Sequence, residues 1–341
     1  MNIKRYTIQL FIVFLVFLLV YVTIYLREKN EYKSITGFCQ GTSYLITYES
    51  KQGEDLQPAV DSLLTQIDLS LSIYNPHSVI SRFNRNETDT KADEKFIRVF
   101  NKSFEVHQRT GGAFDITMGP VVNALGFGST DRLDVDGTLI ATLMKFVGMN
   151  KVRLRDRRLI KDNPNIILDF NGIAQGYSVD LIAEFLNELG IKNYLIEIGG
   201  EVRCKGTNKH NQIWRIGIEK PVEGNMTPGT NLQVIIGLKN KSLATSGNYR
   251  KYYEKDGIKY VHTVNPETGY PVVSNLLSAS VVADDCMSAD AYATALMVFG
   301  VDKSIGFLKR NEFLDAYLIY SGQDGRFQIY ATPGFDEFIA G

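Results

Sequence analysis

The sequence has few cysteines and no excess of charge of either sign. Its three cysteines, at positions 39, 204 and 286, lie far apart without Cys-x-x-Cys spacing, which argues against a zinc site and against a dense disulfide framework. Tandem repeats and low-complexity segments are also absent. Lysine and arginine (37 residues) nearly cancel aspartate and glutamate (38 residues), and no basic stripe with interleaved aromatic residues occurs. We therefore expect no nucleic-acid partner, because the chain has no sustained field that would attract polyanions.

One long apolar run is present near the N-terminus. Residues 10–26 are apolar or aromatic apart from Thr23, and Lys4 and Arg5 precede them. This length is close to the roughly 20 residues that a helix needs to span hydrocarbon. A cleaved signal peptide would have a shorter apolar region and a small-x-small cleavage site, which residues 25–28 do not provide. The run therefore predicts an uncleaved transmembrane anchor in the lipid bilayer, with the positive charges in the cytoplasm and the rest of the chain outside it.

The rest of the chain has the composition of an ordinary globular protein. Of the 341 residues, 44% are apolar and 22% are charged, which is enough for one large domain or two packed lobes. We predict a membrane anchor with a cytoplasmic tip over residues 1–30, a polar linker over 31–40 and one folded domain over 41–341.

Hydrophobic periodicity predicts helices and strands that do not alternate regularly. Helices are expected over 56–71, 94–110, 172–189 and 289–299, the last two ended by Gly190 and Gly300. Strands are expected over 44–48, 166–170, 194–198, 213–219, 232–238, 277–283 and 316–320. This mixture favours an α+β fold with largely antiparallel sheets.

The first segment with functional potential is the junction over residues 166–180. A predicted strand passes through Asn171-Gly172 into a helix, and free backbone N–H groups at such a helix start form an anion site. Asp169 and Asp180 add carboxylates nearby. Taken alone, the segment is also typical of an ordinary strand–helix junction in which Asn171 is the N-cap and Asp180 a solvated helix residue.

The second segment places two oxygen ligands on one helix face. Asp290 and Thr294 are four residues apart, so they share a face of the predicted helix. Joined by a backbone carbonyl from another segment, they suit magnesium, which completes its shell with water and substrate phosphate. Taken alone, the pattern is also explained by Ser288 capping the helix while Asp290 complements the helix dipole.

The third segment contains a histidine beside a tight turn. Pro266-Glu-Thr-Gly269 is a turn signal that would hold His262 on an adjoining strand end. A histidine there can take a proton from an attacking hydroxyl at neutral pH, although a lone histidine is more often structural.

The fourth segment, residues 110–120, ends a helix in glycines and is expected to expose Phe114 and Asp115. Bare backbone beside an aromatic ring and a carboxylate suits a flat ligand ring with polar edges. A glycine C-cap followed by a buried phenylalanine explains the segment equally well.

In their order along the chain, these segments resemble the FAD:protein FMN transferase (ApbE) family. The resemblance extends from about residue 41 to residue 300, and this many matches in one order are specific although each is weak alone. The matching motifs are Gly41-Thr-Ser-Tyr44, Ser72-Ile-Tyr74 with Ser81-Arg-Phe-Asn84, Gly112-Ala-Phe-Asp115, Gly172-Ile-Ala-Gln-Gly176, Ile198-Gly-Gly200, Ala244-Thr-Ser-Gly247, His262 to Pro271, and Ala289-Asp-Ala-Tyr-Ala-Thr294.

The resemblance implies two T-fold-like α+β lobes with FAD held between them. It places Mg²⁺ on the Gly172 carbonyl, Asp290 and Thr294. The sequence departs from the family at residue 175, where members often carry lysine or glutamate, and at residues 125–128, which lack the tryptophan that commonly precedes Gly-Phe-Gly. The first departure bears on how the pyrophosphate or ribityl chain is held. Positions implied to line the FAD site are Gln40, Tyr74, Ala113, Phe114, Asp115, Asp169, Gln175 and Val264.

The resemblance also implies an activity. The enzyme would use magnesium to split FAD, attach FMN through a phosphoester bond to a threonine or serine hydroxyl of a target protein, and release AMP. His262 is the first candidate for the base, with Asp180 behind it. The implied acceptors are subunits of membrane redox complexes of the Nqr or Rnf type, and the implied location is the bacterial inner (cytoplasmic) membrane, with the domain facing the periplasm or cell exterior. Two alternatives remain, namely magnesium-dependent hydrolysis of FAD to FMN and AMP, and flavin binding without turnover.

Overall fold

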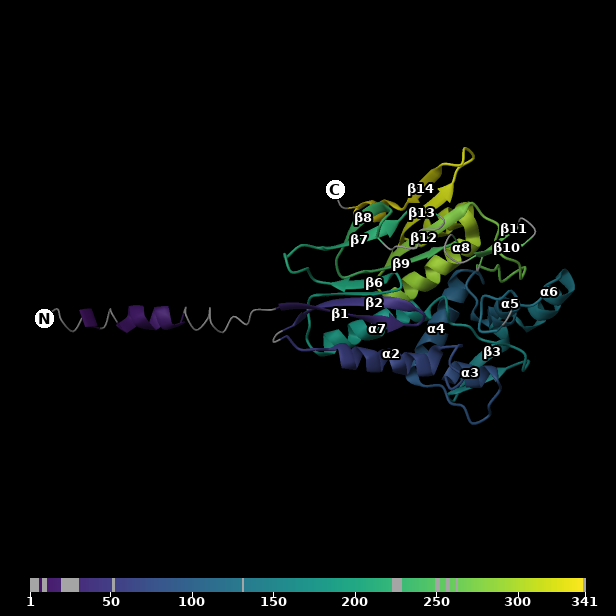
Figure 1. Cartoon of the computed structure of the whole chain (residues 1–341), viewed down its shortest axis with the longest axis horizontal. Coiled ribbons are helices and arrows are strands. Elements are labelled where there is room, and N and C mark those ends of the chain that lie inside the picture. The colour runs from purple at the N-terminus through teal and green to yellow at the C-terminus, as the bar shows by residue number, and fades with distance from the viewer. Residues whose placement is uncertain are drawn as a thin grey trace.

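The fold is built on one eight-stranded sheet in a computed structural model that describes residues 6–7, 11–19, 31–50, 53–130, 132–222, 229–248, 252–255, 258–261 and 263–339. The strand order is β1-β2-β5-β6-β9-β12-β13-β14, and every pairing is antiparallel (Figure 1). Its strands are β1 (Glu31–Cys39), β2 (Thr42–Ser50), β5 (Tyr194–Ile198), β6 (Glu201–Lys205), β9 (Ser242–Gly247), β12 (Leu276–Ala283), β13 (Asp315–Ser321) and β14 (Phe327–Ala331). Three separate hairpins are formed by β3 (Val152–Arg155) with β4 (Arg158–Lys161), β7 (Trp214–Glu219) with β8 (Leu232–Leu238), and β10 (Tyr252–Lys255) with β11 (Ile258–Val261).

The sheet consists of two four-stranded halves. They meet where β6 pairs with β9, through Val202↔Leu243 and Arg203↔Ser242. The two implied lobes are thus halves of one continuous sheet rather than separate bodies. The α+β class with antiparallel strands is confirmed.

The two faces of the sheet pack against different layers. Tyr194, Ile196 and Ile198 of β5 belong to the main core, in which α7 and α8 pack against the sheet and against each other. Leu195, which points the other way, packs on a second core formed with the β7–β8 hairpin and α9. The helices are α2 (Gln57–Leu71), α3 (Val79–Asn84), α4 (Glu94–Arg109), α5 (Gly119–Ala124), α6 (Gly137–Leu143), α7 (Ala174–Glu188), α8 (Cys286–Leu308) and α9 (Pro333–Asp336), with short 3₁₀ turns η1 (Ile116–Met118), η2 (Met144–Phe146) and η3 (Met149–Lys151).

The predicted linker over residues 31–40 is wrong, because residues 31–39 form β1. This strand pairs with β2 along its whole length, from Glu31↔Ser50 to Cys39↔Thr42, and a two-residue turn with positive φ angles joins the strands. Only Ile35 of the strand is buried. An edge strand with so little buried surface shows no clear alternation of apolar and polar residues, so its sequence resembles a linker.

The predicted strand over residues 166–170 is also wrong. The segment belongs to no sheet, although Ile166, Leu168 and Phe170 are buried as alternation predicts. Side chains take the place of a neighbouring strand: the Asn84 amide hydrogen-bonds both the N–H and the C=O of Leu168, at 2.8 and 2.9 Å. Alternation therefore identified a buried extended segment but could not show what its backbone bonds to.

Helix α8 begins earlier than predicted, at Cys286. Its 23 residues form two helical stretches, because Gly300 has a non-helical conformation with φ 71° and ψ −175°. The first stretch therefore ends at Gly300 as predicted, and the second stretch, which follows directly after the kink, was not predicted. Ser304 Oγ donates to the Leu296 carbonyl at 3.0 Å, which satisfies the oxygen that residue 300 would bond in a regular helix.

Gly300→Ala is expected to lower the free energy of unfolding by about 1–3 kcal/mol, because this backbone conformation is strained for any residue with a side chain. The added Cβ would also lie 2.9 Å from Ser274 Oγ. Gly306→Ala is the matched control in the same helix: its nearest neighbour would be Arg310 Nη1 at 3.7 Å, so a gain of up to about 1 kcal/mol is expected. Urea unfolding measures both changes, and equal effects of the two substitutions would contradict the prediction.

The predicted anchor lies mostly outside the described residues. Residues 11–19 are helical with exposed apolar side chains. Residues 1–5, 8–10 and 20–30 are not among the described residues. Within the described parts of the chain, the one helix long and apolar enough to cross a membrane is α8, and 56% of its apolar window is buried inside the fold. Helix α8 is accordingly a core helix.

Candidate functional site

Several turns meet at one end of the sheet, which we call the turn end. The β1–β2 turn at Gln40-Gly41 lies beside the β5–β6 turn at Gly199-Gly200, where the Gly199 N–H donates to the Ser43 carbonyl at 3.1 Å. The last residue of β9, Gly247, reaches the same end by its pairing with Ser278. The start of α7 also lies here, because a side chain on Gly199 would be 2.9 Å from Gln175 Nε2.

The three predicted magnesium ligands lie together at the turn end. A Cβ on Gly172 would be 3.2 Å from Thr294 Oγ1. Four residues on, the Gly176 N–H donates to Asp290 Oδ2 at 3.0 Å, so the start of α7 is bonded directly to α8. Ser246 Oγ lies 3.5 Å from Thr294 Oγ1 and adds a hydroxyl that the sequence analysis did not single out.

The Asp290 carboxylate is buried, with 6% of the residue exposed. Burial raises its pKa to about 7, the negative charge of Asp180 acts in the same direction, and the Gly176 N–H opposes both. Among the described residues, none donates a hydrogen bond to Asp290 Oδ1, and no three His, Cys, Asp or Glu side chains form a metal cluster. One carboxylate, one hydroxyl and one carbonyl would form a small set of hard oxygen donors, of the kind that suits Mg²⁺, Ca²⁺ or Mn²⁺.

Asp180, the residue predicted as reserve base, makes structural contacts with the start of α8. Its two carboxylate oxygens accept the N–H groups of Cys286 and Met287 at 2.9 and 2.8 Å, and Arg203 forms an ion pair with Oδ1. Burial raises its pKa to about 6 against the opposing effects of Arg203 and the two N–H groups. With both oxygens occupied, Asp180 fixes the start of α8, one turn before Asp290. It is buried, so it is not a solvated helix residue.

Asp180→Asn is expected to lower the free energy of unfolding by about 2–4 kcal/mol, because it leaves the partly buried Arg203 without its charged partner and weakens the hydrogen bonds that the buried carboxylate accepts. Asp284→Asn is the control, since Asp284 pairs with Lys241 while 88% of its side chain is exposed. That exposed pair should contribute less than about 1 kcal/mol. Denaturant unfolding of both variants checks the difference, and comparable losses would refute the role given to Asp180.

Phe114 lies beside the oxygen donors, and neither Phe114 nor Asp115 is exposed as predicted. Phe114 is 4% exposed, and its Cε2 lies 3.3 Å from the Cβ position of Gly172. Asp115 Oδ1 accepts hydrogen bonds from the N–H and the hydroxyl of Thr117. His107 Nδ1 lies 2.9 Å from the Phe114 carbonyl and 3.6 Å from Asp115 Oδ2. The glycine-rich segment, which includes the partly buried Ala113, thus lies at the edge of the site and is fixed by its contacts with His107 and Thr117.

The start of α7 lacks the predicted cap. Ile173 is the N-cap residue and makes no side-chain hydrogen bond, whereas the Asn171 N–H donates to Asp169 Oδ1 at 2.8 Å. Three donors of the expected anion site are already used, because Asp290 accepts the Gly176 N–H and the Phe170 carbonyl accepts the N–H groups of Ile173 and Ala174. The ordinary N-cap interpretation of Asn171 is therefore wrong, and the anion site is smaller than the sequence suggests.

Gln40 is packed under the start of α7. Its Nε2 donates to Ser178 Oγ at 2.6 Å, and its Oε1 is buried without a hydrogen-bond partner among the described residues. An unsatisfied buried oxygen costs free energy unless a ligand or water supplies a donor. Gln40 is therefore placed to accept a hydrogen bond from a bound molecule.

Tyr74 and Asp169 form another side of the site. Tyr74 is 61% exposed, and its hydroxyl accepts a hydrogen bond from Asn171 Nδ2 at 3.3 Å. Burial raises the pKa of Asp169 to about 6. Both residues therefore adjoin the Asn171-Gly172 turn.

His262 lies outside the described residues. Nearby, Val264 is buried and forms a bridge with Pro271, and the Asn265 N–H donates to the Tyr270 carbonyl at 2.9 Å, which closes the predicted turn. Thr263 Oγ1 donates to Asn248 Oδ1 at 2.7 Å, so this turn is joined to the residue that follows β9. Asn248 was missed by the sequence analysis, although it directly follows the Ala244–Gly247 motif.

The fold and site define an antiparallel α+β protein with oxygen donors and a buried aromatic ring gathered at one end of its sheet. A model of the ApbE family matches residues 40–318, and the chain belongs to that family. It is 35% identical over 322 residues to a FAD:protein FMN transferase of Vibrio cholerae, and the alignment covers 92% of this chain and 95% of the relative. It is also 35% identical over 313 residues to the enzyme of that name from Haemophilus influenzae, and this alignment covers 88% of this chain and 89% of the relative.

Solved structures agree with this assignment. The flavin transferase ApbE from Vibrio cholerae superposes with a TM-score of 0.82 at 34% identity, covering 91% of this chain and all of that structure. The apo form of the Pseudomonas stutzeri flavinyl transferase ApbE gives a TM-score of 0.81 at 32% identity, with 92% and 98% covered.

Proposed function

We propose that this protein is a FAD:protein FMN transferase, the activity named for its relatives. The observation that carries the proposal is the convergence of Gly172, Asp290 and Thr294 beside Phe114 at the turn end. Hard oxygen donors next to an aromatic wall suit a ligand that combines a pyrophosphate with a flat ring system. FAD has both parts.

Mg²⁺ would be held by the Gly172 carbonyl, the Asp290 carboxylate and the Thr294 hydroxyl. When bound, it would neutralise the charge that develops on the pyrophosphate as the bond to AMP breaks. The close packing of α7 on α8 through Gly176 supports this ligand set, because it fixes two ligands from one helix against a carbonyl from another segment.

The protein residues would bind FAD and handle one proton. Gln40, Tyr74, Ala113, Phe114, Asp115, Asp169, Gln175 and Val264 are proposed to contact FAD. A threonine or serine hydroxyl of the acceptor attacks the FMN phosphorus in line, a P–O phosphoester bond forms, and the phosphoanhydride bond breaks with its electron pair going to AMP. The hydroxyl proton passes to His262, the proposed base. Asp180 holds α8 and takes no part in this transfer.

Incubation of the full-length protein in detergent with FAD, Mg²⁺ and a candidate acceptor tests the activity. Acceptor mass increased by one FMN supports transfer. Free FMN and AMP with an unmodified acceptor would instead show FAD hydrolysis, and unchanged FAD would show binding alone. Either of the last two results, obtained with several acceptors, would refute the proposed transfer.

We further propose that residues 1–30 anchor the domain in the bacterial inner membrane, with the transferase domain, which begins at strand β1 rather than at residue 41, outside the cytoplasm. Strand β1 supports a defined orientation, because it runs from Glu31 to Cys39 and therefore leads from the N-terminal segment to the turn end (Figure 1). At roughly 3.3 Å per residue, this separates the two ends of the strand by close to 30 Å. Such a site faces away from the anchor and suits acceptor domains of membrane redox complexes of the Nqr or Rnf type.

A further inference from the structure

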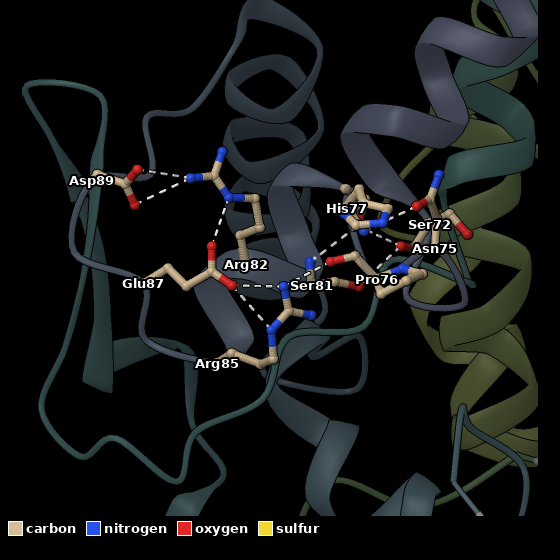
Figure 2. A network of polar contacts seen from close by, with 10 residues as sticks. Ser72, Asn75, Pro76, His77, Ser81, Arg82, Arg85, Glu87 and Asp89 are labelled. Atoms are coloured by element: carbon tan, nitrogen blue, oxygen red, sulfur yellow. Dashed lines mark hydrogen bonds and ion pairs between the residues drawn. The ribbon is translucent and has the colours of Figure 1, made fainter.

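Helix α3 connects two sides of the candidate site without belonging to it. At its N-terminal end, Ser78 Oγ caps the helix by accepting the Ser81 N–H at 3.1 Å and donates to the Ser72 carbonyl at 2.6 Å. Arg85, just past the helix, donates to the Pro76 carbonyl at 2.7 Å, as Figure 2 shows. These bonds hold the loop over residues 72–78, which carries Tyr74.

At the other end of α3, Asn84 holds the segment over residues 166–170. Its carboxamide makes the pair of hydrogen bonds to Leu168 that a neighbouring strand would make. Leu168 immediately precedes Asp169, whose own N–H donates to the Ile116 carbonyl at 2.8 Å. The Asn84 amide is therefore one residue away from a proposed FAD contact and four residues away from the Gly172 carbonyl.

The loop over residues 72–78 and the segment over residues 166–170 meet at the site. Asn171 donates one hydrogen bond from its backbone to Asp169 and one from its side chain to the Tyr74 hydroxyl. Lys161 Nζ also bonds this region, through the Ile166 carbonyl at 2.9 Å, but its contacts end before Leu168. The bonds to the backbone of Leu168 itself come from Asn84.

We infer that Asn84 is a positioning residue for FAD binding: it fixes the backbone that presents Asp169 and the Gly172 carbonyl while touching neither ligand. This inference rests on the proposed FAD site. The proposed role differs from a general contribution to stability, because loss of the Asn84 hydrogen bonds should increase the mobility of residues 168–172 specifically and weaken FAD binding.

The first test measures hydrogen exchange of residues 166–172 in the full-length protein without FAD. Asn84→Asp removes the donor to the Leu168 carbonyl, and Asn84→Ala removes both bonds without adding charge. Asn86→Asp is a matched control, because Asn86 donates a 3.1 Å hydrogen bond to the carbonyl of Pro164, which lies just before this segment and further from the site. We expect exchange at 166–172 to rise by about tenfold or more in both Asn84 variants and to stay at the parent level in Asn86→Asp. Unchanged exchange in Asn84→Ala, or an equal rise in all three variants, would overturn the inference.

The second test measures the FAD dissociation constant by equilibrium dialysis. Both Asn84 variants should bind FAD about tenfold or more weakly, and Asn86→Asp should remain within about twofold of the parent. Asp169→Ala, measured in parallel, tests the proposed site separately: if it binds FAD like the parent, the site assignment fails. If Asp169→Ala weakens binding and the Asn84 variants do not, the site assignment stands and the positioning role of Asn84 is refuted. Weakening by Asn84→Asp alone would show an effect of the added charge, and it would also refute that role.

Discussion

Asp290→Asn is expected to lower flavin transfer by about 10³-fold while the fold remains intact, because transition-state charge stabilisation is often the largest single contribution to catalysis. The substitution keeps the size of the side chain and an oxygen that can still accept the Gly176 N–H. It removes the one negative charge among the three proposed magnesium ligands. Transfer should therefore fall, and the magnesium concentration needed for half-maximal activity should rise.

Stability separates this effect from a folding defect. In metal-free buffer, Asp290→Asn should be at least as stable as the parent, since a neutral amide avoids the cost of burying a carboxylate. Added Mg²⁺ should raise the unfolding temperature of the parent and leave that of Asp290→Asn unchanged. Asp284→Asn, an exposed Asp-to-Asn change, should retain both transfer and the response to Mg²⁺. Undiminished transfer by Asp290→Asn in magnesium-limited buffer would remove the metal assignment.

Amphipathic and strongly alternating segments were predictable from sequence. Strands β5 and β8 begin and end at the predicted residues, and α2 and α4 differ by one residue at one end. Each of these elements has one face in a core, so the spacing of its apolar residues along the sequence follows the spacing of its buried positions. Strand β1 was missed because only one of its nine residues is buried, and α3 because six residues are too few to show a helical period.

The candidate site was only partly readable, because its contacts join distant parts of the chain. Asp180 lies 106 residues before its partner Cys286, and Gly176 lies 114 residues before Asp290. No local spacing can show that such residues meet. The order of family motifs indicated which residues belong to one site. The contacts of these residues required the fold. Asp180 binds the first N–H groups of α8, and Asn84 bonds the backbone of Leu168, and neither contact is visible in the motifs.

Gly176→Ala is expected to combine a loss of stability with a larger loss of transfer. Gly176 lies where α7 crosses α8, and a Cβ added there would be 2.8 Å from Asp290 Cβ and even closer to the Cys286 carbonyl oxygen. A backbone carbonyl cannot swing aside as a flexible side chain can, so the two helices must separate. Overpacking of this kind costs about 1–3 kcal/mol. It also shifts Asp290 relative to the Gly172 carbonyl, and a displacement of about 1 Å at a reacting centre can reduce the rate by about 10²-fold.

Gly306→Ala again provides the matched control, because Gly306 is also helical but has room for a methyl group. It should transfer FMN at the parent rate. If the methyl group at residue 176 acts by separating the proposed ligands, higher Mg²⁺ concentrations should restore part of the lost transfer in Gly176→Ala, whereas a general folding defect would not respond. Transfer above about half of the parent rate in Gly176→Ala would show that the close approach of α7 and α8 is not needed to hold the proposed ligands, since displacement should cost far more than twofold.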